Sequence, residues 1–302
     1  MESVAVFSRI SECDLPFYRQ WLEYYTKIGI DEFYITGDSL YGNLPFLKEY
    51  NVRFFPCSHY EDEKQKMLFF TEVIKSNIKQ DYVLMIDVDE YLAIRNIKEI
   101  IDDGQSCYFF SWFMIPSLIT EYKNMYEQSV NVQGFNLTQG KSLHRVSDID
   151  TVFNYHSFNK HLWDPEIINN TLYHFRFRGL RDIINKCYTS NGYTEWHKSD
   201  SIKLHKFLSE DKLKIEDVPN RVILAAAEYY CNNTREQKIL PIDCTSHSDF
   251  SYYNCPINIG NFEKRFNILL DNLKPILEGF QFMRYCKASL MELLKLHKTI
   301  EV

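Results

Sequence analysis

An apolar segment that ends in a cluster of acids constrains the fold of this chain more than any other feature. Residues 81–92 read DYVLMIDVDEYL. The apolar run Tyr82–Ile86 suits a buried strand, and three acids follow it at once, namely Asp87, Asp89 and Glu90. Clustered carboxylates beside a buried strand are costly unless a positive charge compensates them. The segment therefore predicts either a ligand site at a strand end or a solvated turn.

A metal is the simplest compensating charge. Open α/β sheets bind their ligands at the carboxyl ends of strands, where carboxylate oxygens suit Mg²⁺ or Mn²⁺ that carries phosphates. An isolated D-x-D triplet is common by chance, so the triplet alone does not decide between the metal site and the solvated turn. The apolar strand that leads into the triplet supports the metal site, whereas the triplet by itself does not.

Strands and helices alternate through the N-terminal part of the chain. Apolar strands are expected at residues 3–7, 32–36, 52–55 and 82–86, and amphipathic helices between Asp14 and Gly29 and at residues 64–77. Within the first helix, Trp21, Tyr25 and Ile28 are expected to pack on the sheet. This alternation predicts an α/β fold with a mainly parallel sheet flanked by helices.

The rest of the chain is less regular. Residues 116–171 are expected to be rich in loops, and helices are expected at residues 180–188, 218–230 and 262–298, the last one interrupted by Pro275 and Gly279. We therefore expect an α/β catalytic domain over residues 1–200 and a helical C-terminal annex over residues 201–302.

Composition narrows the partners and the compartment. The chain has 302 residues with 34 Lys and Arg and 41 Asp and Glu, and this net charge of -7 argues against a general nucleic-acid surface. None of the eight Cys residues forms a C-x-x-C pair. With no basic leader or membrane-spanning apolar run expected, the sequence predicts a cytoplasmic protein. Peripheral contact with the inner face of a membrane and the oligomeric state are left open.

Two blocks in order carry a resemblance to a known family. WLEYYTKIGIDEFYIT, Trp21–Thr36, resembles the E-W-x-x-Y-H-x-x-x-G-V-D-x-F-Y-I-Y-D opening of the family 2-like and family 92 glycosyltransferases. MIDVDEYL, Met85–Leu92, resembles their F-I-D-x-D-E-F-L signature. HFRFRGLRDIINKCYTSNG, His174–Gly192, is similar to their N-H-Y-x-x-K-S-x-E-E-F-x-x-K-x-x-R-G block. The resemblance covers about residues 4–192, and the C-terminal third is unmatched.

The resemblance implies a GT-A fold, in which the D-x-D motif holds a divalent metal on the diphosphate of a nucleotide-sugar donor. The implied metal ligands for Mn²⁺ or Mg²⁺ are Asp87, Asp89 and His174. The implied contacts with the donor, most simply a UDP-sugar, are Arg9, Glu12, Asp38, Gln65, Asp87 and Lys141. The chain departs from the family pattern after its first two strands, where Arg9-Ile10-Ser11-Glu12 replaces N-E and Gly37-Asp38-Ser39 lacks a second acid.

The leading hypothesis is an inverting, metal-dependent glycosyltransferase, of the hexosyltransferase type, that acts on a glycan or other hydroxyl acceptor in polysaccharide biosynthesis. An inverting transfer needs a base for the acceptor hydroxyl, and the candidates are His156, Asp164 and Glu90. One alternative is a nucleotidyltransferase on a similar sheet, although residues 8–14 lack the Gly-rich, basic phosphate loop typical of such enzymes. The other is a non-catalytic carbohydrate-binding relic of the fold, which the intact Asp87 and Asp89 disfavour.

Overall fold

The computed structural model describes residues 2–57, 63–101, 105–115, 121, 123–131, 134–154, 157–158, 166–188, 199–230, 239–253, 257–277 and 300–301. The chain divides into two compact units. Unit 1 comprises Met1–Phe113, Leu137–His174 and Ile239–Asp249, and unit 2 comprises Met114–Asn136, Phe175–Lys238 and Phe250–Val302. The chain passes between the units more than once, so the boundary expected at residue 200 stays a prediction about where a catalytic domain ends.

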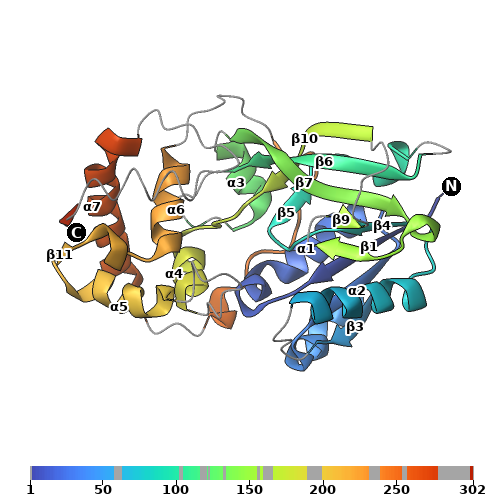
Figure 1. Cartoon of the computed structure of the whole chain (residues 1–302), viewed down its shortest axis with the longest axis horizontal. Helices are drawn as coiled ribbons and strands as arrows, with labels where there is room; N and C mark the ends of the chain where they lie inside the picture. Colours follow the sequence, from blue (N-terminus) through green and yellow to red (C-terminus); the bar gives the residue numbers. More distant parts are fainter. Residues whose placement is uncertain are drawn as a thin grey trace. The chain divides into compact units, whose positions relative to one another are not determined.

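Unit 1 is built on an eight-stranded sheet with the order β3-β2-β1-β4-β7-β6-β10-β5 (Figure 1). Its strands are β1 (Val4–Arg9), β2 (Glu32–Gly37), β3 (Val52–Pro56), β4 (Tyr82–Met85), β5 (Glu90–Leu92), β6 (Cys107–Met114), β7 (Phe135–Arg145) and β10 (Glu166–His174). β1 pairs in parallel with β2 and β4, and β2 pairs in parallel with β3. β7 is antiparallel to β4, and β5 is antiparallel to β10. The predicted α/β class, with parallel strands and flanking helices, is confirmed, and antiparallel strands extend the sheet.

Helix α1 (Leu15–Lys27) covers one face of the parallel strands. Pro16 fits its first turn, and Gly29, with φ of 97°, ends it in the left-handed conformation that favours glycine. Trp21, Tyr25 and Ile28 have no exposed surface, which confirms that they are core residues. The Trp21 ring lies 5.8 Å from the ring of Phe33 on β2. The 3.6-residue period of the apolar positions thus directs one helical face onto the sheet.

Helix α2 (Glu63–Asn77) packs on the opposite face. Successive side chains of a strand point to opposite faces, so Tyr34 faces away from its neighbour Phe33. Tyr34 belongs to a buried cluster with Phe70 and Ile74 of α2 and Phe7 of β1. Short strands β8 (Val152–Asn154) and β9 (Ser157–Phe158) form a separate antiparallel pair, and β8 contacts α2.

The expectation that residues 116–171 are mostly loop is wrong for β7, which has 11 residues, and for most of β10. The β7 sequence FNLTQGKSLHR has polar residues at its centre, so no apolar alternation marks it as a strand. Two features place it inside the sheet. Gly140 allows close approach to β6, since a Cβ there would overlap the Phe110 carbonyl oxygen, and Lys141 is buried against acids. Tertiary context here overrides local propensity.

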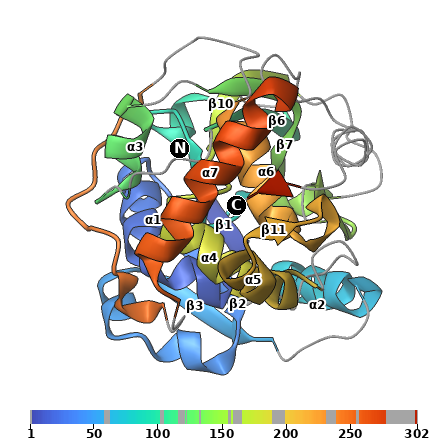
Figure 2. The ribbon, with the colours of Figure 1, turned by 90° about the vertical axis from the view of Figure 1, so that its left-hand side faces the viewer.

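Unit 2 is mainly helical. Its helices are α3 (Met125–Asn131), α4 (Leu180–Tyr188), α5 (Asp200–Ser209), α6 (Asn220–Tyr229) and α7 (Ile259–Leu277), and β11 (Lys212–Leu213) pairs with β12 (Ile300–Glu301). The helices α4 to α7 pack against one another, with α7 across the front in Figure 2. The predicted helices at 180–188 and 218–230 are confirmed within two residues. α7 continues through Pro275 to Leu277, and Gly279 lies outside the described residues.

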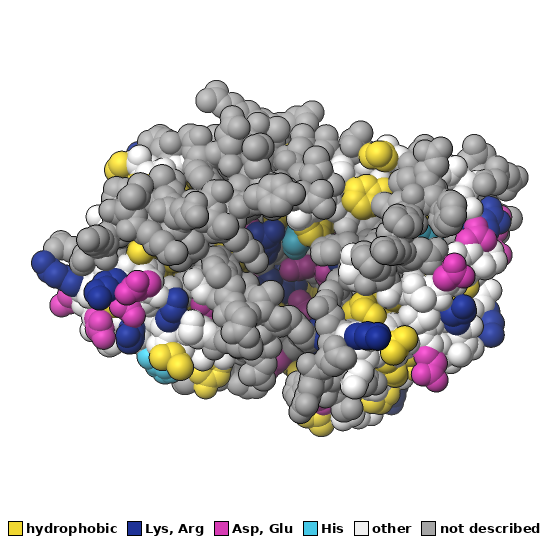
Figure 3. Space-filling view, in the orientation of Figure 1, with side chains coloured by type: hydrophobic (Ala, Val, Ile, Leu, Met, Phe, Trp, Pro, Cys, Tyr) yellow, Lys and Arg dark blue, Asp and Glu magenta, His cyan; other side chains and the backbone are white. Residues whose placement is uncertain are grey.

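Buried charges in unit 2 are matched by partners. Asp200 is fully buried and accepts hydrogen bonds from the backbone N–H groups of Asn220 and Arg221, so it satisfies the first turn of α6. Asp182 is also fully buried and pairs with Arg178. On the left of the face seen in Figure 3, acidic and basic side chains are interspersed. Lys206 and Asp217 form an ion pair of this unit at 2.9 Å. Among the described residues, none of the helices has the length and apolar character needed to cross a membrane.

Trp21→Ala provides a test of the sheet core. Because Trp21 is completely buried among aromatic rings, we expect the free energy of unfolding in urea to fall by about 3–5 kcal/mol. Leu68→Ala on α2 is the control, since Leu68 is 59% exposed and its truncation leaves no cavity. Equal stability of the two variants would contradict the assignment of Trp21 to the core.

A second test concerns Glu23 of α1, which anchors the segment Ile239–Asp249 within unit 1. Its carboxylate accepts hydrogen bonds from the backbone of Thr245 and Ser246 and pairs with Lys27 at 2.7 Å. Burial alone would raise the pKa of Glu23, but these partners outweigh it and lower the pKa from 4.5 to about 2. A depressed carboxyl pKa stabilises the fold above the unfolded pKa, and this stabilisation is lost as the pH falls towards the folded value.

Glu23→Gln should therefore lower the free energy of unfolding by about 2–3 kcal/mol at pH 7. The difference from the wild-type protein should shrink as the pH falls from about 4.5 towards 2, because both proteins are then uncharged at this position. Urea denaturation at a series of pH values measures it. A difference that does not change with pH would show that the charge of Glu23 is not what stabilises the contact.

Candidate active site at the carboxyl end of β4

The sheet topology selects one place for a ligand. From β1 the chain moves outwards to β2 and β3 and then returns to β4 on the other side of β1. The adjacent strands β1 and β4 are parallel, so their carboxyl ends lie at the same edge, where Arg9 ends β1 and Asp87 follows β4. A reversal of this kind is the switch point at which open α/β sheets bind their ligands. The acidic loop predicted from the sequence lies at this point.

Aromatic side chains of α1 hold the acidic loop in place. The Trp21 indole Nε1–H donates to the carbonyl of Asp87 at 3.1 Å. The Tyr25 hydroxyl donates to the carbonyl of Glu90 and accepts from the N–H of Leu92, both at 3.1 Å. The Tyr24 hydroxyl donates to the carbonyl of Leu92 at 2.6 Å. These core residues therefore satisfy the backbone of a loop that would otherwise bury polar groups without partners.

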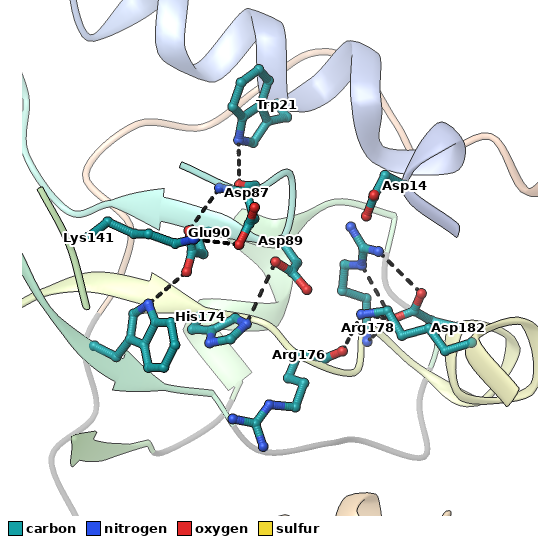
Figure 4. A network of polar contacts seen from close by, with 12 residues as sticks. Asp14, Trp21, Asp87, Asp89, Glu90, Lys141, His174, Arg176, Arg178 and Asp182 are labelled. Atoms are coloured by element: carbon teal, nitrogen blue, oxygen red, sulfur yellow. Dashed lines mark hydrogen bonds and ion pairs between the residues drawn. The ribbon is translucent and has the colours of Figure 1, made fainter. Parts of the chain in front are cut away.

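Lys141 supplies the positive charge that the acidic loop requires. It lies on β7 with a fully buried side chain, and its Nζ is 2.6 Å from Asp87 Oδ2 and 3.7 Å from Glu90 Oε2 (Figure 4). Burial alone would lower the pKa of Lys141, but the charges of Asp87 and Glu90 outweigh it and raise the pKa. The ammonium group therefore stays charged and neutralises part of the loop.

Glu90 is buried too deeply for the role of base. Its side chain has no exposed surface, its Oε1 accepts from Trp112 Nε1–H at 2.7 Å, and its Oε2 accepts from the Asp87 N–H at 2.8 Å. Burial raises the pKa of Glu90 well above its usual range, while the charge of Lys141 acts in the opposite direction. With both oxygens engaged, Glu90 fits a structural role, which argues against the predicted proton abstraction from an acceptor.

The structure brings His174 to Asp89, although 85 positions separate them in the sequence. β10 pairs with β5 so that His174 is opposite Glu90, and His174 Nε2 is 3.6 Å from Asp89 Oδ1. Both side chains are mostly buried, with 10% of His174 and 16% of Asp89 exposed. The His174 ring lies against Trp112, with 4.6 Å between ring centroids. Two of the three implied metal ligands thus lie close together, and their role as ligands stays a prediction.

The other predicted site residues lie on or just after β1, after β2 and on α2. Arg9 ends β1 and is half-buried, and Glu12 begins the 3₁₀ turn Glu12–Asp14 that follows it. Asp38 is exposed after β2, where its carboxylate caps a 3₁₀ turn by accepting from the N–H of Leu40. Gln65 is exposed on α2. The role of these four residues as donor contacts stays a prediction.

Two of the predicted catalytic residues, His156 and Asp164, lie outside the described residues. The acceptor base therefore stays a prediction for both. Trp112, by contrast, is a site residue that the sequence points to only weakly. Apart from Ser111, its neighbours on β6 are apolar, so the local pattern does not distinguish an indole that only packs from one that also donates to Glu90.

A divalent metal fits this donor set in part. The Asp89 carboxylate and the His174 imidazole are acceptable ligands for Mn²⁺, and such ions often take only one or two carboxylates with phosphates completing the shell. Asp87 fits less well, because its Oδ2 is bound to Lys141. Within the part of the chain that the structure describes, no three His, Cys, Asp or Glu side chains gather as a ready metal site. Of the three implied ligands, Asp89 and His174 therefore fit a metal better than Asp87 does, and the ligand set stays a prediction.

Comparisons with known proteins give little more. No protein-family model matches the chain, and no curated protein is significantly similar to it. Among solved structures, HddC from Yersinia pseudotuberculosis is 10% identical, with 58% of this chain and 89% of that chain covered and a TM-score of 0.33. The 4-diphosphocytidyl-2C-methyl-D-erythritol synthase of Anaerococcus prevotii is 11% identical, with 48% and 71% covered and a TM-score of 0.28. The galactosyltransferase LgtC is 14% identical, with 47% and 58% covered and a TM-score of 0.26. At such low scores these likenesses carry no argument about this chain.

Trp112→Phe tests the support of Glu90. The substitution keeps an aromatic ring but removes the indole N–H of residue 112. The buried Glu90 Oε1 therefore loses its 2.7 Å hydrogen bond. We expect the free energy of unfolding to fall by about 1–3 kcal/mol in urea denaturation. Trp112→Phe combined with Glu90→Gln measures the coupling, and strictly additive losses would contradict a direct interaction.

Proposed function

We propose that this protein is a glycosyltransferase that uses a nucleoside-diphosphate sugar. One observation carries the proposal: Asp89, His174 and the Asp87–Lys141 pair converge at the carboxyl end of β4, at the switch point of the sheet. Two carboxylates and an imidazole at such an edge, with a buried ammonium that balances their charge, suit a ligand that brings both phosphates and hydroxyl groups. The resemblance of residues 4–192 to family 2-like and family 92 glycosyltransferases supports the same assignment.

Each residue of the site has a separate task in this proposal. Asp89 and His174 would hold Mn²⁺ or Mg²⁺, which when bound stabilises the negative charge that develops on the leaving diphosphate. Asp87 keeps 46% of its side chain exposed while one oxygen binds Lys141, so its other oxygen can accept a hydrogen bond from a sugar or ribose hydroxyl. Glu90, which accepts from Trp112 Nε1–H and from the Asp87 N–H, orients the acidic loop.

The base for the acceptor is assigned by elimination within the predicted set. The burial of Glu90 disfavours it, so we infer that the inverting reaction would use His156 or Asp164. A base must reach the acceptor hydroxyl within hydrogen-bonding distance. The proposal also keeps the expectations drawn from the sequence. They are a UDP-sugar donor, a glycan or other hydroxyl acceptor, a role in polysaccharide biosynthesis and a cytoplasmic location.

The segment after β1 disfavours nucleotidyl transfer. A phosphate-binding loop presents free backbone N–H groups to its ligand. Here the N–H and the hydroxyl of Ser11 both donate to Asp14 Oδ2, at 3.1 and 2.5 Å. The backbone N–H of Ser11 is therefore already engaged by Asp14 and is not presented to a phosphate. This favours glycosyl transfer over the nucleotidyltransferase alternative.

A panel of nucleoside diphosphates and triphosphates, with and without Mn²⁺, tests the proposal in a thermal-shift assay. A nucleoside diphosphate with Mn²⁺, at about 100 times its Kd, should stabilise the protein by about 2.7 kcal/mol, or raise the melting temperature by roughly 5–10 °C. Asp89→Asn should lose the shift and the transfer of sugar from the donor. Asp217→Asn, at an exposed ion pair of unit 2, is the control.

The outcomes separate the three functions. A shift only with triphosphates would favour the nucleotidyltransferase. A shift with free glycans but with no nucleotide would favour a carbohydrate-binding protein. A metal-dependent diphosphate shift that Asp89→Asn leaves intact would refute the site assigned here.

A further inference from the structure

The two aspartates of the acidic loop face different partners. Asp87 Oδ2 lies 2.6 Å from the Lys141 ammonium, whereas Asp89 Oδ1 lies 3.6 Å from the His174 imidazole. Their exposures differ as well, since 46% of the Asp87 side chain is exposed and only 16% of that of Asp89. The symmetry of the D-x-D sequence is therefore not kept in three dimensions.

Lys141 requires an anion beside it. Its side chain is fully buried, and an uncompensated ammonium inside a protein is strongly unfavourable. Glu90 is a second acid near Lys141, but its oxygen is 1.1 Å further away (3.7 against 2.6 Å). Its oxygens already accept from Trp112 and from the Asp87 N–H. Asp87 is thus the principal counter-ion of Lys141.

The pairing of β4 with β7 strengthens the dependence of Lys141 on Asp87. Asp87 follows β4, and Lys141 lies on β7, which pairs antiparallel to β4 with Leu84 opposite Leu143. The ion pair therefore joins the two segments just beyond the paired residues Leu84 and Leu143. Without the charge of Asp87, the buried Lys141 ammonium would depend on Glu90, whose oxygen is further away.

We propose that the Lys141 ammonium is the permanent counter-charge of the acidic loop and that its ion pair gives the two aspartates different roles. Asp87 serves Lys141 and holds the loop, and Asp89 with His174 alone faces the divalent metal. The part that concerns the metal rests on the proposed function, and the part that concerns Lys141 and Asp87 does not. In this proposal Lys141 is a positioning residue, whereas the resemblance implies a contact with the donor.

A crossed comparison of two isosteric variants tests this division. Asp87→Asn should lower the melting temperature by about 5 °C or more, because it leaves a buried ammonium without its charged partner. It should leave the affinity for Mn²⁺, measured by electron paramagnetic resonance of the free ion, within about threefold of the wild-type value. Asp89→Asn should do the opposite, with little change in melting temperature and a loss of Mn²⁺ affinity of about tenfold or more.

A double-mutant cycle keeps the test valid if Asp87→Asn folds poorly. Lys141→Met removes the buried charge at similar volume, so the combination of Asp87→Asn with Lys141→Met should melt higher than Asp87→Asn alone. Lys206→Met, at an exposed pair with Asp217, is the matched control and should change the melting temperature by no more than about 2 °C.

Three results would overturn the inference. They are equal stability of Asp87→Asn and Asp89→Asn, an equal loss of Mn²⁺ affinity in both variants, and no rescue by Lys141→Met. Failure of the proposed function has a different signature. The wild-type protein would then bind neither Mn²⁺ nor a nucleoside diphosphate, while the comparison of melting temperatures would still decide whether Asp87 is the counter-ion of Lys141.

Discussion

The pairing of Lys141 with the acids after β4 is the interaction on which the site depends. Three carboxylates follow a buried strand, and one of them, Glu90, has no exposed surface. Such a cluster would repel itself in a medium of low dielectric constant unless a positive charge lay among its members. The ammonium of Lys141 provides that charge from a neighbouring strand. This charge balance lets an acidic loop begin directly at the end of an apolar strand.

Hydrogen bonds from the core complete what the ion pair begins. Trp21, Tyr24 and Tyr25 use apolar rings to bury α1 against the sheet and use their polar atoms to satisfy the loop backbone. Trp112 acts in the same way from β6, since it donates to Glu90 and packs on His174. Aromatic residues with a polar atom suit this double role. The rigidity of the site thus comes from the same residues as the stability of unit 1.

The topology determines which residues can meet. The reversal between β1 and β4 opens the edge at which Asp87 and Asp89 lie, and the antiparallel pairing of β5 with β10 brings His174 opposite Glu90. A sheet that was parallel throughout would not return β10 in this direction. The antiparallel strands therefore have a functional consequence, because they deliver both the Lys141 ammonium and the His174 imidazole to the acidic loop.

The sequence by itself determined the alternation of strands and helices in the first part of the chain, the core face of α1 and the position of the acidic loop. These follow from local periodicity, since apolar spacing reports which face of an element is buried. Only the tertiary structure decided that β7 is a strand, because its polar residues are stabilised by pairing and by a distant acid rather than by local pattern. It also decided that Asp87 and Asp89 differ and that Glu90 is buried. Burial and charge pairing join residues far apart in the chain, and no local pattern records which partner each side chain meets.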